Sequence, residues 1–401
     1  MISRLNSKIF SQNIFELYLL VFSLATLGSI MQISGTSWDV TSHLMNEPET
    51  FFTPSHTLLY SGIGLIIIAT VLFTHFYIKN KDSITNRPSK LSFYLLLIGS
   101  VVCILSGAAD YLWHQIFGID GLLSPTHISL MTGMLITSIG VVIGLARIKI
   151  SDTKTKSKLE ILRNIALIPA FAALWFTIIW YVYFFSLPFS NGERFNFNPD
   201  PYLASIIATL FLPLFGSMIF FIASKTISKF GAVTAIGGLV IFINLFANII
   251  PTDGILFSSI LWYFPLSFIS IIIADFLTNN FTFRKRNYNE KSINKIVAAV
   301  FFGAAFYIFN YPMIMWAYAI PLNMSLFVNN QELPLMSQLI SNFLTTLPIM
   351  LIISIPSGAI MSVIGYLITN KMIKSANTNK EGNNINDNSI QINNNNQKID
   401  C

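Results

Sequence analysis

The sequence carries little charge for its length. Of its 401 residues only 10% are Asp, Glu, Lys or Arg, whereas 53% are hydrophobic, and the mean hydropathy is +0.64. Soluble domains contain about 25% charged residues, so this chain has too few polar side chains to cover a water-exposed surface. The stretches 63–76, 93–104 and 236–250 contain no Asp, Glu, Lys or Arg at all. These shortages exclude a soluble enzyme and a disordered protein, and they leave a polytopic membrane protein.

Cysteine is also scarce. Cys103 lies inside an apolar stretch and Cys401 is the last residue, so the pair predicts no disulfide framework. The first apolar run is long enough to span a membrane and no small-residue cleavage site follows a short core, so we expect no cleaved signal peptide. What the chain has in abundance is aromatic residues, with 35 Phe and 14 Tyr, which favour lipid-facing helices. We therefore predict an all-α integral membrane protein.

Ten apolar stretches are long enough to cross the bilayer. About twenty residues of helix span the roughly 30 Å hydrocarbon core. The expected spans are about 14–36, 54–78, 92–113, 125–148, 164–187, 202–224, 231–250, 256–277, 294–320 and 337–370. The last is too long for one straight crossing, and we expect kinks at Pro348 and Pro356.

Basic residues lie almost entirely on one side of these spans. Of the 24 Lys and Arg, only Arg194 falls in a loop on the other side. Cytoplasmic loops are enriched in Lys and Arg. We therefore expect a multi-pass plasma-membrane protein with both termini in the cytoplasm and with the loops 37–53 and 114–124 outside.

Four of the five histidines belong to two copies of one pattern, Asp-x3-His-x12-His. The copies, 71 residues apart, consist of Asp39, His43 and His56, and of Asp110, His114 and His127. In both copies a proline stands two residues before the last histidine (Pro54, Pro125), and a glycine stands six residues after it (Gly62, Gly133). Two matched copies among so few Asp and His residues indicate an internal repeat.

The spacing within each copy has a physical meaning. An Asp and a His four residues apart lie on the same face of a helix. Thr53-Pro54 and Ser124-Pro125 are in the order preferred at N-cap and first helical positions, which places His56 and His127 in the first turn of the following helix. The positive end of the helix macrodipole there disfavours imidazolium and leaves the ring ready to bind metal. Each hairpin thus gathers two imidazoles and one carboxylate, called here a triad, and the repeat predicts that the two triads are neighbours.

Composition and repeat together predict three regions. Residues 1–148 form a four-helix metal-binding half with pseudo-repeats at 34–62 and 105–133. Residues 149–372 form a six-helix membrane region without an assigned role. The Asn-rich segment 373–401 is too polar to bury a core and is expected to be a disordered cytoplasmic tail.

Ligand type alone leaves the metal open. Two imidazoles and a carboxylate suit copper, zinc and non-haem iron alike. Neither triad contains a thiolate or thioether, which disfavours a Cu(I) carrier. Without a metal, the residues would fit a proton relay or a pair of haem ligands, but haem would leave both aspartates unexplained.

The pattern resembles the C subunit of the copper-containing membrane monooxygenases, the particulate methane and ammonia monooxygenases. The similarity rests on Asp-x3-His-x12-His, on Trp-His-Gln at 113–115 and on Phe-Thr-Pro-Ser-His at 52–56, and it covers about residues 1–148. It implies membrane-embedded copper sites at both triads, where the family has an Asp/His/His and an Asn/His/His-type site. This chain departs from that pattern because it has a complete Asp triad in both copies and some six extra spans.

Three functions remain open from the sequence. The first is a copper oxidoreductase acting on a small or lipophilic substrate; since no haem, flavin or iron–sulfur motif is present, a partner subunit or a quinol would supply electrons. The second is a metal- or proton-coupled transporter. The third is a zinc-dependent membrane hydrolase with Glu47 or Glu49 as general base. We expect no nucleic-acid partner.

The predicted topology can be tested with single cysteines introduced in a cysteine-free background. Asn46→Cys is expected to react with a membrane-impermeant maleimide in intact cells, because its loop lies outside, whereas Asn388→Cys should react only after lysis. Labelling of Asn388→Cys in intact cells, with Asn46→Cys protected, would show that the orientation is the opposite of the predicted one.

Overall fold

The computed structural model of the chain describes residues 2–44, 50–79, 87–118, 123–148, 156–187, 200–250, 263–280, 295–306, 345–346 and 348–372. Within these ranges the regular structure is helical, with no strand. The helices are α1 (Ile2–Leu44), α2 (Pro54–Lys79), α3 (Arg87–Phe117), α4 (Pro125–Arg147), α5 (Lys156–Phe184), α6 (Pro201–Ile227), α7 (Ala232–Ile249) and α9 (Tyr263–Asn280), followed by Lys295–Phe306 and Pro348–Met372.

Seven of the described helices are long and apolar enough to cross a membrane. The all-helical membrane class is therefore confirmed. Each of the ten expected ranges overlaps a described helix, while the count of ten crossings stays a prediction. The largest difference is α1, which runs from Ile2 to Leu44 where a helix over 14–36 was expected. The chain has no proline before Pro48, so none interrupts this helix up to Asp39 and His43. Residues 345–346 and Pro348–Met372 are helical, while 347, 337–344 and 373–401 lie outside the described residues, so the kinks expected at Pro348 and Pro356 stay predictions.

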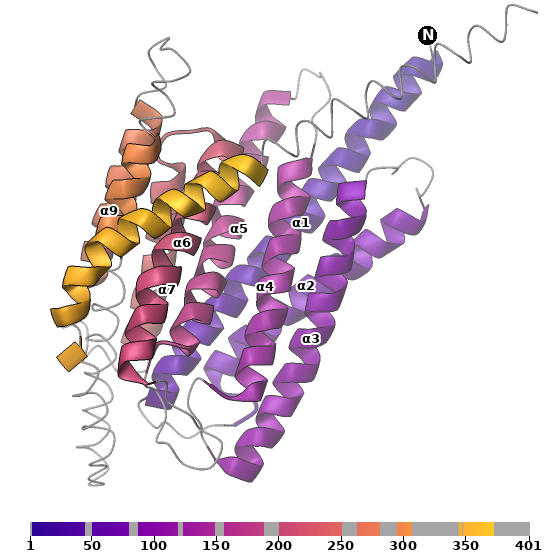
Figure 1. Cartoon of the computed structure of the whole chain (residues 1–401). Coiled ribbons are helices and arrows are strands. Elements are labelled where there is room, and N and C mark those ends of the chain that lie inside the picture. The colour runs from indigo at the N-terminus through magenta and orange to yellow at the C-terminus, as the bar shows by residue number, and fades with distance from the viewer. Residues whose placement is uncertain are drawn as a thin grey trace, which may run out of the picture.

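The first four helices form two antiparallel hairpins, α1 with α2 and α3 with α4 (Figure 1). Each hairpin packs at one pair of glycines. A Cβ on Gly62 would lie 2.5 Å from the carbonyl oxygen of Gly28, and a Cβ on Gly133 would lie 3.0 Å from that of Gly99. Small residues let membrane helices approach with their backbones nearly in contact. Gly28 and Gly99, like Gly62 and Gly133, are 71 residues apart, so the packing follows the sequence repeat.

Contacts between equivalent residues indicate that a pseudo-twofold axis relates the two hairpins. Gln32 Nε2 donates to Cys103 Sγ at 3.9 Å, and both side chains are buried. These residues are also 71 positions apart, and equivalent residues touch each other only on the axis that relates two copies. Because α1 and α3 run in the same direction, this axis runs along the helices, as in transporters built from parallel repeats.

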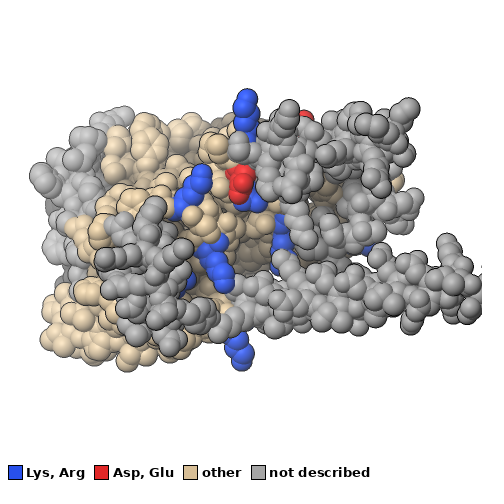
Figure 2. All heavy atoms as spheres, turned by 90° about the horizontal axis from the view of Figure 1, so that it is seen from above, with Lys and Arg blue, Asp and Glu red and all other residues tan. Residues whose placement is uncertain are grey.

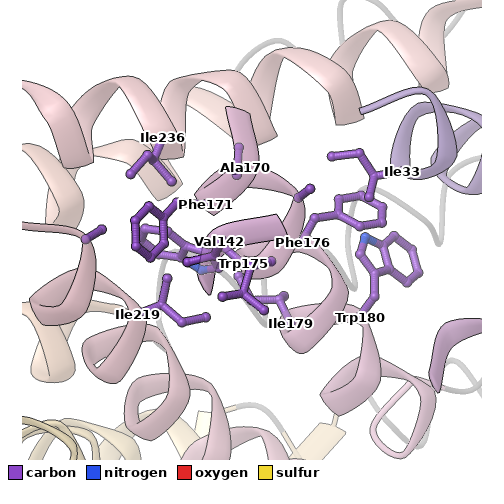
Figure 3. Close-up of a cluster of buried hydrophobic side chains, with 14 of the residues drawn as sticks. Ile33, Val142, Ala170, Phe171, Trp175, Phe176, Ile179, Trp180, Ile219 and Ile236 are labelled. Atoms are coloured by element: carbon purple, nitrogen blue, oxygen red, sulfur yellow. The ribbon is translucent and has the colours of Figure 1, made fainter. Parts of the chain in front are cut away.

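Helix α5 joins the two halves of the molecule. It lies against α1 and α4 on one side and against α6 and α7 on the other. Figure 3 shows its large side chains, among them Phe171, Trp175 and Trp180, inside a core completed by the neighbouring helices. Those neighbours contribute Ile33 from α1, Val142 from α4, Ile219 from α6 and Ile236 from α7. At the same interface Thr132 Oγ1 and the Tyr181 hydroxyl lie 2.7 Å apart. The four-helix half is therefore packed against an aromatic helix.

A buried carboxylate on α9 is hydrogen-bonded to the start of α7. Asp275 on α9 is fully buried. Its Oδ2 accepts hydrogen bonds from the backbone N–H of Thr234 at 2.9 Å and from the Thr234 hydroxyl at 2.8 Å. Thr234 lies in the first turn of α7, where N–H groups have no partner within the helix. Asp275 thus caps α7 from a neighbouring helix and complements its dipole.

The two ends of the molecule differ in charge. At the end where α1 begins, Lys and Arg side chains stand out (Figure 2). Arg147 at the end of α4 and Lys225 near the end of α6 belong to this end. The triads lie at the opposite end, where α1 and α3 finish and α2 and α4 begin. Under the positive-inside rule the triads would face away from the cytoplasm, and that sidedness stays a prediction.

The close contact between Gly62 and Gly28 can be tested by comparing the stability of two glycine variants on α2. Gly62→Ala is expected to lower the free energy of unfolding by about 1–3 kcal/mol, because its methyl group would press on backbone atoms of Gly28 and Gln32. Gly64→Ala is the matched control, since a Cβ there meets nothing within 4 Å. Thermal unfolding in detergent, followed by circular dichroism, should separate the two variants. Equal midpoints would contradict the close packing.

Candidate metal centre

The first triad joins α1 to α2. Asp39 and His43 lie one turn apart near the end of α1, and His56 lies in the first turn of α2. Asp39 Oδ2 is 3.6 Å from His43 Nε2, and Asp39 Oδ1 is 3.2 Å from His56 Nε2. The carboxylate therefore faces both imidazoles, and the structure brings together the three residues that the spacing predicted.

The second triad repeats this arrangement between α3 and α4. Asp110 Oδ1 lies 3.6 Å from His114 Nε2 and 3.4 Å from His127 Nε2. In each triad the three ligand atoms lie within 4.8 Å of one another, close enough to hold a metal ion. The triads differ in which member is fully buried: His56 in the first and Asp110 in the second.

The spacing of these atoms fits coordination better than direct hydrogen bonding. Ligand atoms about 2.0–2.1 Å from a tetrahedral ion are about 3.3 Å from one another. The four imidazole–carboxylate distances of 3.2, 3.4, 3.6 and 3.6 Å lie close to that value. Most of them exceed the usual 2.7–3.2 Å range of an N–H···O hydrogen bond. Three protein ligands would leave a fourth position open for water or substrate.

Hydroxyl groups orient both aspartates. Ser55 Oγ donates to Asp39 Oδ1 at 2.7 Å, and the side chain of Thr126 is hydrogen-bonded to Asp110. Ser55 and Thr126 occupy equivalent positions 71 residues apart. Sequence reasoning missed them, although the signal was present: each hydroxyl stands between the proline and the histidine, in Thr-Pro-Ser-His at 53–56 and Ser-Pro-Thr-His at 124–127.

Backbone contacts fix the last histidine of each triad. The His56 Nδ1 lies 3.1 Å from the Thr50 carbonyl oxygen, which can only accept a hydrogen bond, so Nδ1 carries the proton and Nε2 presents its lone pair to the triad. In the second copy Ser124 is the N-cap of α4, and its Oγ accepts from the backbone N–H of His127 at 3.2 Å. The predicted helix start at Ser124-Pro125 is confirmed, and α2 begins at Pro54 as predicted.

The two triads are neighbours. The ring of His43 lies 5.3 Å from that of His114 and 5.9 Å from that of His127, measured between centroids. His43 and His114 are equivalent residues, so the pseudo-twofold axis that passes between Gln32 and Cys103 also passes between these rings. The adjacency predicted from the repeat is confirmed, and all six residues form one cluster at the end of the four helices.

Aromatic side chains cover the first triad. Phe51 stacks on Tyr60 at 4.9 Å and meets Tyr111 edge-on at 5.3 Å, while the Tyr60 ring lies 5.6 Å from that of His56. An apolar cover lowers water access and strengthens the interactions of charged groups beneath it. Glu47 and Glu49, the general bases expected for a hydrolase, lie outside the described residues.

Comparison with known proteins found no matching protein family, no matching curated protein and no matching solved structure.

The hydroxyl groups behind the aspartates generate a prediction for metal titration. Ser55→Ala and Thr126→Val are each expected to weaken binding of a divalent ion at their own triad by about 10–100-fold, the usual effect of losing a partner that orients a ligand. Isothermal titration of the purified protein with Cu²⁺ or Zn²⁺ would measure it. Ser129→Ala is the matched control, because this exposed hydroxyl on α4 donates to the Pro125 carbonyl oxygen and belongs to neither triad. Unchanged affinities in both test variants would show that the two hydroxyls do not contribute to metal binding.

Proposed function

We propose that this chain is an integral membrane metalloprotein that binds copper at its two Asp/His/His triads and takes part in an oxidation reaction. The observation that carries the proposal is the duplicated triad itself. Two sets of ligand atoms, each within 4.8 Å, recur at equivalent places of an internal repeat and meet at one end of four helices.

Burial argues for a bound ion. Ionisable residues inside membrane helices are costly, and they are retained chiefly where they serve a function. Asp110 is almost completely buried, and its Oδ1 faces two imidazole nitrogens at 3.4 and 3.6 Å. A divalent cation between these groups would balance the carboxylate charge. The same cation would satisfy the imidazole lone pairs, which a direct contact between neutral rings and carboxylate leaves partly unused.

Copper is favoured among the candidate metals by two arguments. Affinity for nitrogen and oxygen ligands rises along the first-row divalent ions to a maximum at copper. The resemblance of residues 1–148 to the C subunit of copper membrane monooxygenases implies the same metal. That resemblance also favours an oxidoreductase, in which the residues described here would hold the metal and leave a position open to a small or lipophilic substrate. Partner subunits or a quinol would supply electrons.

A zinc-dependent hydrolase is the second candidate, and one observation favours it. Two-metal hydrolases hold their ions about 3.5–4 Å apart, and the rings of His43 and His114 bring the two triads close enough for a shared centre. In this case a metal-bound water of lowered pKa would be the nucleophile.

The test compares the wild-type protein with His43→Ala/His114→Ala, purified from cells supplied with equal copper, zinc and iron. We expect copper in the wild-type protein and nearly complete loss in the double variant, because two remaining ligands rarely retain a divalent ion at neutral pH. His75→Ala is the control, since His75 is an exposed residue on α2 outside both triads. Elemental analysis and electron paramagnetic resonance report the metal, and oxygen uptake with a quinol reports the reaction.

Each outcome favours one function. Copper with oxygen uptake that the double variant lacks supports the oxidoreductase. Zinc without copper and without oxygen uptake supports the hydrolase. Metal flux into vesicles, lost in the double variant, would support a transporter instead. Full metal content in the double variant would contradict metal binding at the triads.

A further inference from the structure

Three imidazole rings lie together where the triads meet, and they come from both repeats. His43 belongs to the first triad, whereas His114 and His127 belong to the second. The ring centroids are 5.3 Å apart for His43–His114, 5.9 Å for His43–His127 and 5.6 Å for His114–His127. The three rings thus form a nearly equilateral triangle that crosses the boundary between the repeats.

This triangle has the size of a three-histidine metal site. With metal–nitrogen bonds of about 2.0–2.1 Å and the ring centre about 1 Å behind the nitrogen, two imidazoles on one ion have centres about 5–6 Å apart. All three observed separations lie in that range. The rings are also inclined to one another by 60°, 51° and 77° rather than stacked face to face. Inclined rings can direct their edges toward a common point.

The other two ligands of the first triad are held by contacts of their own. The His56 ring is fixed by its Nδ1 contact with the Thr50 carbonyl oxygen and by Tyr60, and its Nε2 faces Asp39 at 3.2 Å. Ser55 holds the same carboxylate from behind. His43 is therefore the ligand of the first triad that contacts both groups: its Nε2 lies 3.6 Å from Asp39 Oδ2, and its ring lies 5.3 and 5.9 Å from the rings of His114 and His127.

We infer that His43, His114 and His127 form a three-imidazole site that crosses the repeats and takes the first metal ion. The inference rests on the proposed metal binding and changes which ligands act together. Asp110, 3.6 Å from His114 Nε2 and 3.4 Å from His127 Nε2, balances the charge of this ion. Three protein ligands leave a fourth position for a small molecule such as water, azide or dioxygen. Asp39 and His56 then hold a second, weaker ion.

Two variants of the first triad separate this arrangement from two independent triads. With independent triads, His43→Ala and His56→Ala have the same effect: each empties the first triad and leaves the second ion at its wild-type affinity. With a site across the repeats, His43→Ala weakens the tightest ion, whereas His56→Ala leaves that ion in place and removes only the weaker one.

The experiment titrates Cu²⁺ into the full-length detergent-solubilised protein, with binding measured against a competing chelator. For His43→Ala we expect the affinity for the first ion to fall by more than about 100-fold, the upper end of what losing even an indirect partner costs. For His56→Ala we expect that affinity to stay within about 3-fold and the second ion to be lost, which follows from the ligands each ion keeps. At one equivalent of ⁶³Cu²⁺ the paramagnetic resonance spectrum should show coupling to three nitrogens in wild type and in His56→Ala.

His43→Gln and His56→Gln repeat the comparison with side chains that keep volume and hydrogen bonding, so that misfolding of an alanine variant does not decide the result. Equal losses in the His43 and His56 variants, with two-nitrogen coupling at one equivalent, would overturn the shared site and leave the two separate triads standing. A wild-type protein that binds no ion would overturn the proposed function as well.

Discussion

Close packing of each hairpin at its glycine pair is the constraint on which the rest of the four-helix half depends. Where Gly62 meets Gly28 and Gly133 meets Gly99, no side chain separates the backbones. In the first hairpin the close approach continues toward the triad, where a Cβ on Gly35 would lie 2.6 Å from the backbone nitrogen of Leu59. At the triads Asp39 must reach His56, and Asp110 must reach His127, across 3.2 and 3.4 Å. A wider crossing of either hairpin would leave its carboxylate too far from the imidazole to share an ion.

Each polar group at the triads is held in place by a further polar group behind it. The imidazoles face the carboxylates, the Ser55 and Thr126 hydroxyls hold the carboxylates, and the Thr50 carbonyl holds His56. An Asp placed at the centre of a membrane helix costs about 2.5–3.5 kcal/mol on insertion scales. Position near the helix ends reduces this cost, and the hydrogen bonds from the hydroxyls offset part of the remainder. The aromatic helix α5 then holds the four-helix half against the rest of the protein, so that these short contacts persist.

Much of this arrangement was predictable because the repeat encodes it in local spacing. The i, i+4 separation places Asp39 beside His43, and Ser124-Pro125 marks the start of α4, without any knowledge of tertiary structure. The contact of His43 with His114 followed only from assuming symmetry. The roles of Ser55 and Thr126 were not foreseen, because a hydroxyl beside a proline is equally typical of an ordinary cap. Trp175 and its neighbours on α5 could not be assigned to a core from sequence, because apolar residues in a membrane helix face lipid and protein alike.

The two hairpins that the pseudo-twofold axis relates are joined in one chain by a short link. Helix α2 ends at Lys79 and α3 begins at Arg87, so seven residues tie the two copies together. In a symmetric homodimer, each residue on the axis faces its own copy; here Gln32 faces Cys103, a pairing that two identical copies could not form. A short tether also gives the second copy an effective concentration of about millimolar. The two neighbouring triads therefore come together within one molecule, and dilution in the bilayer does not separate them.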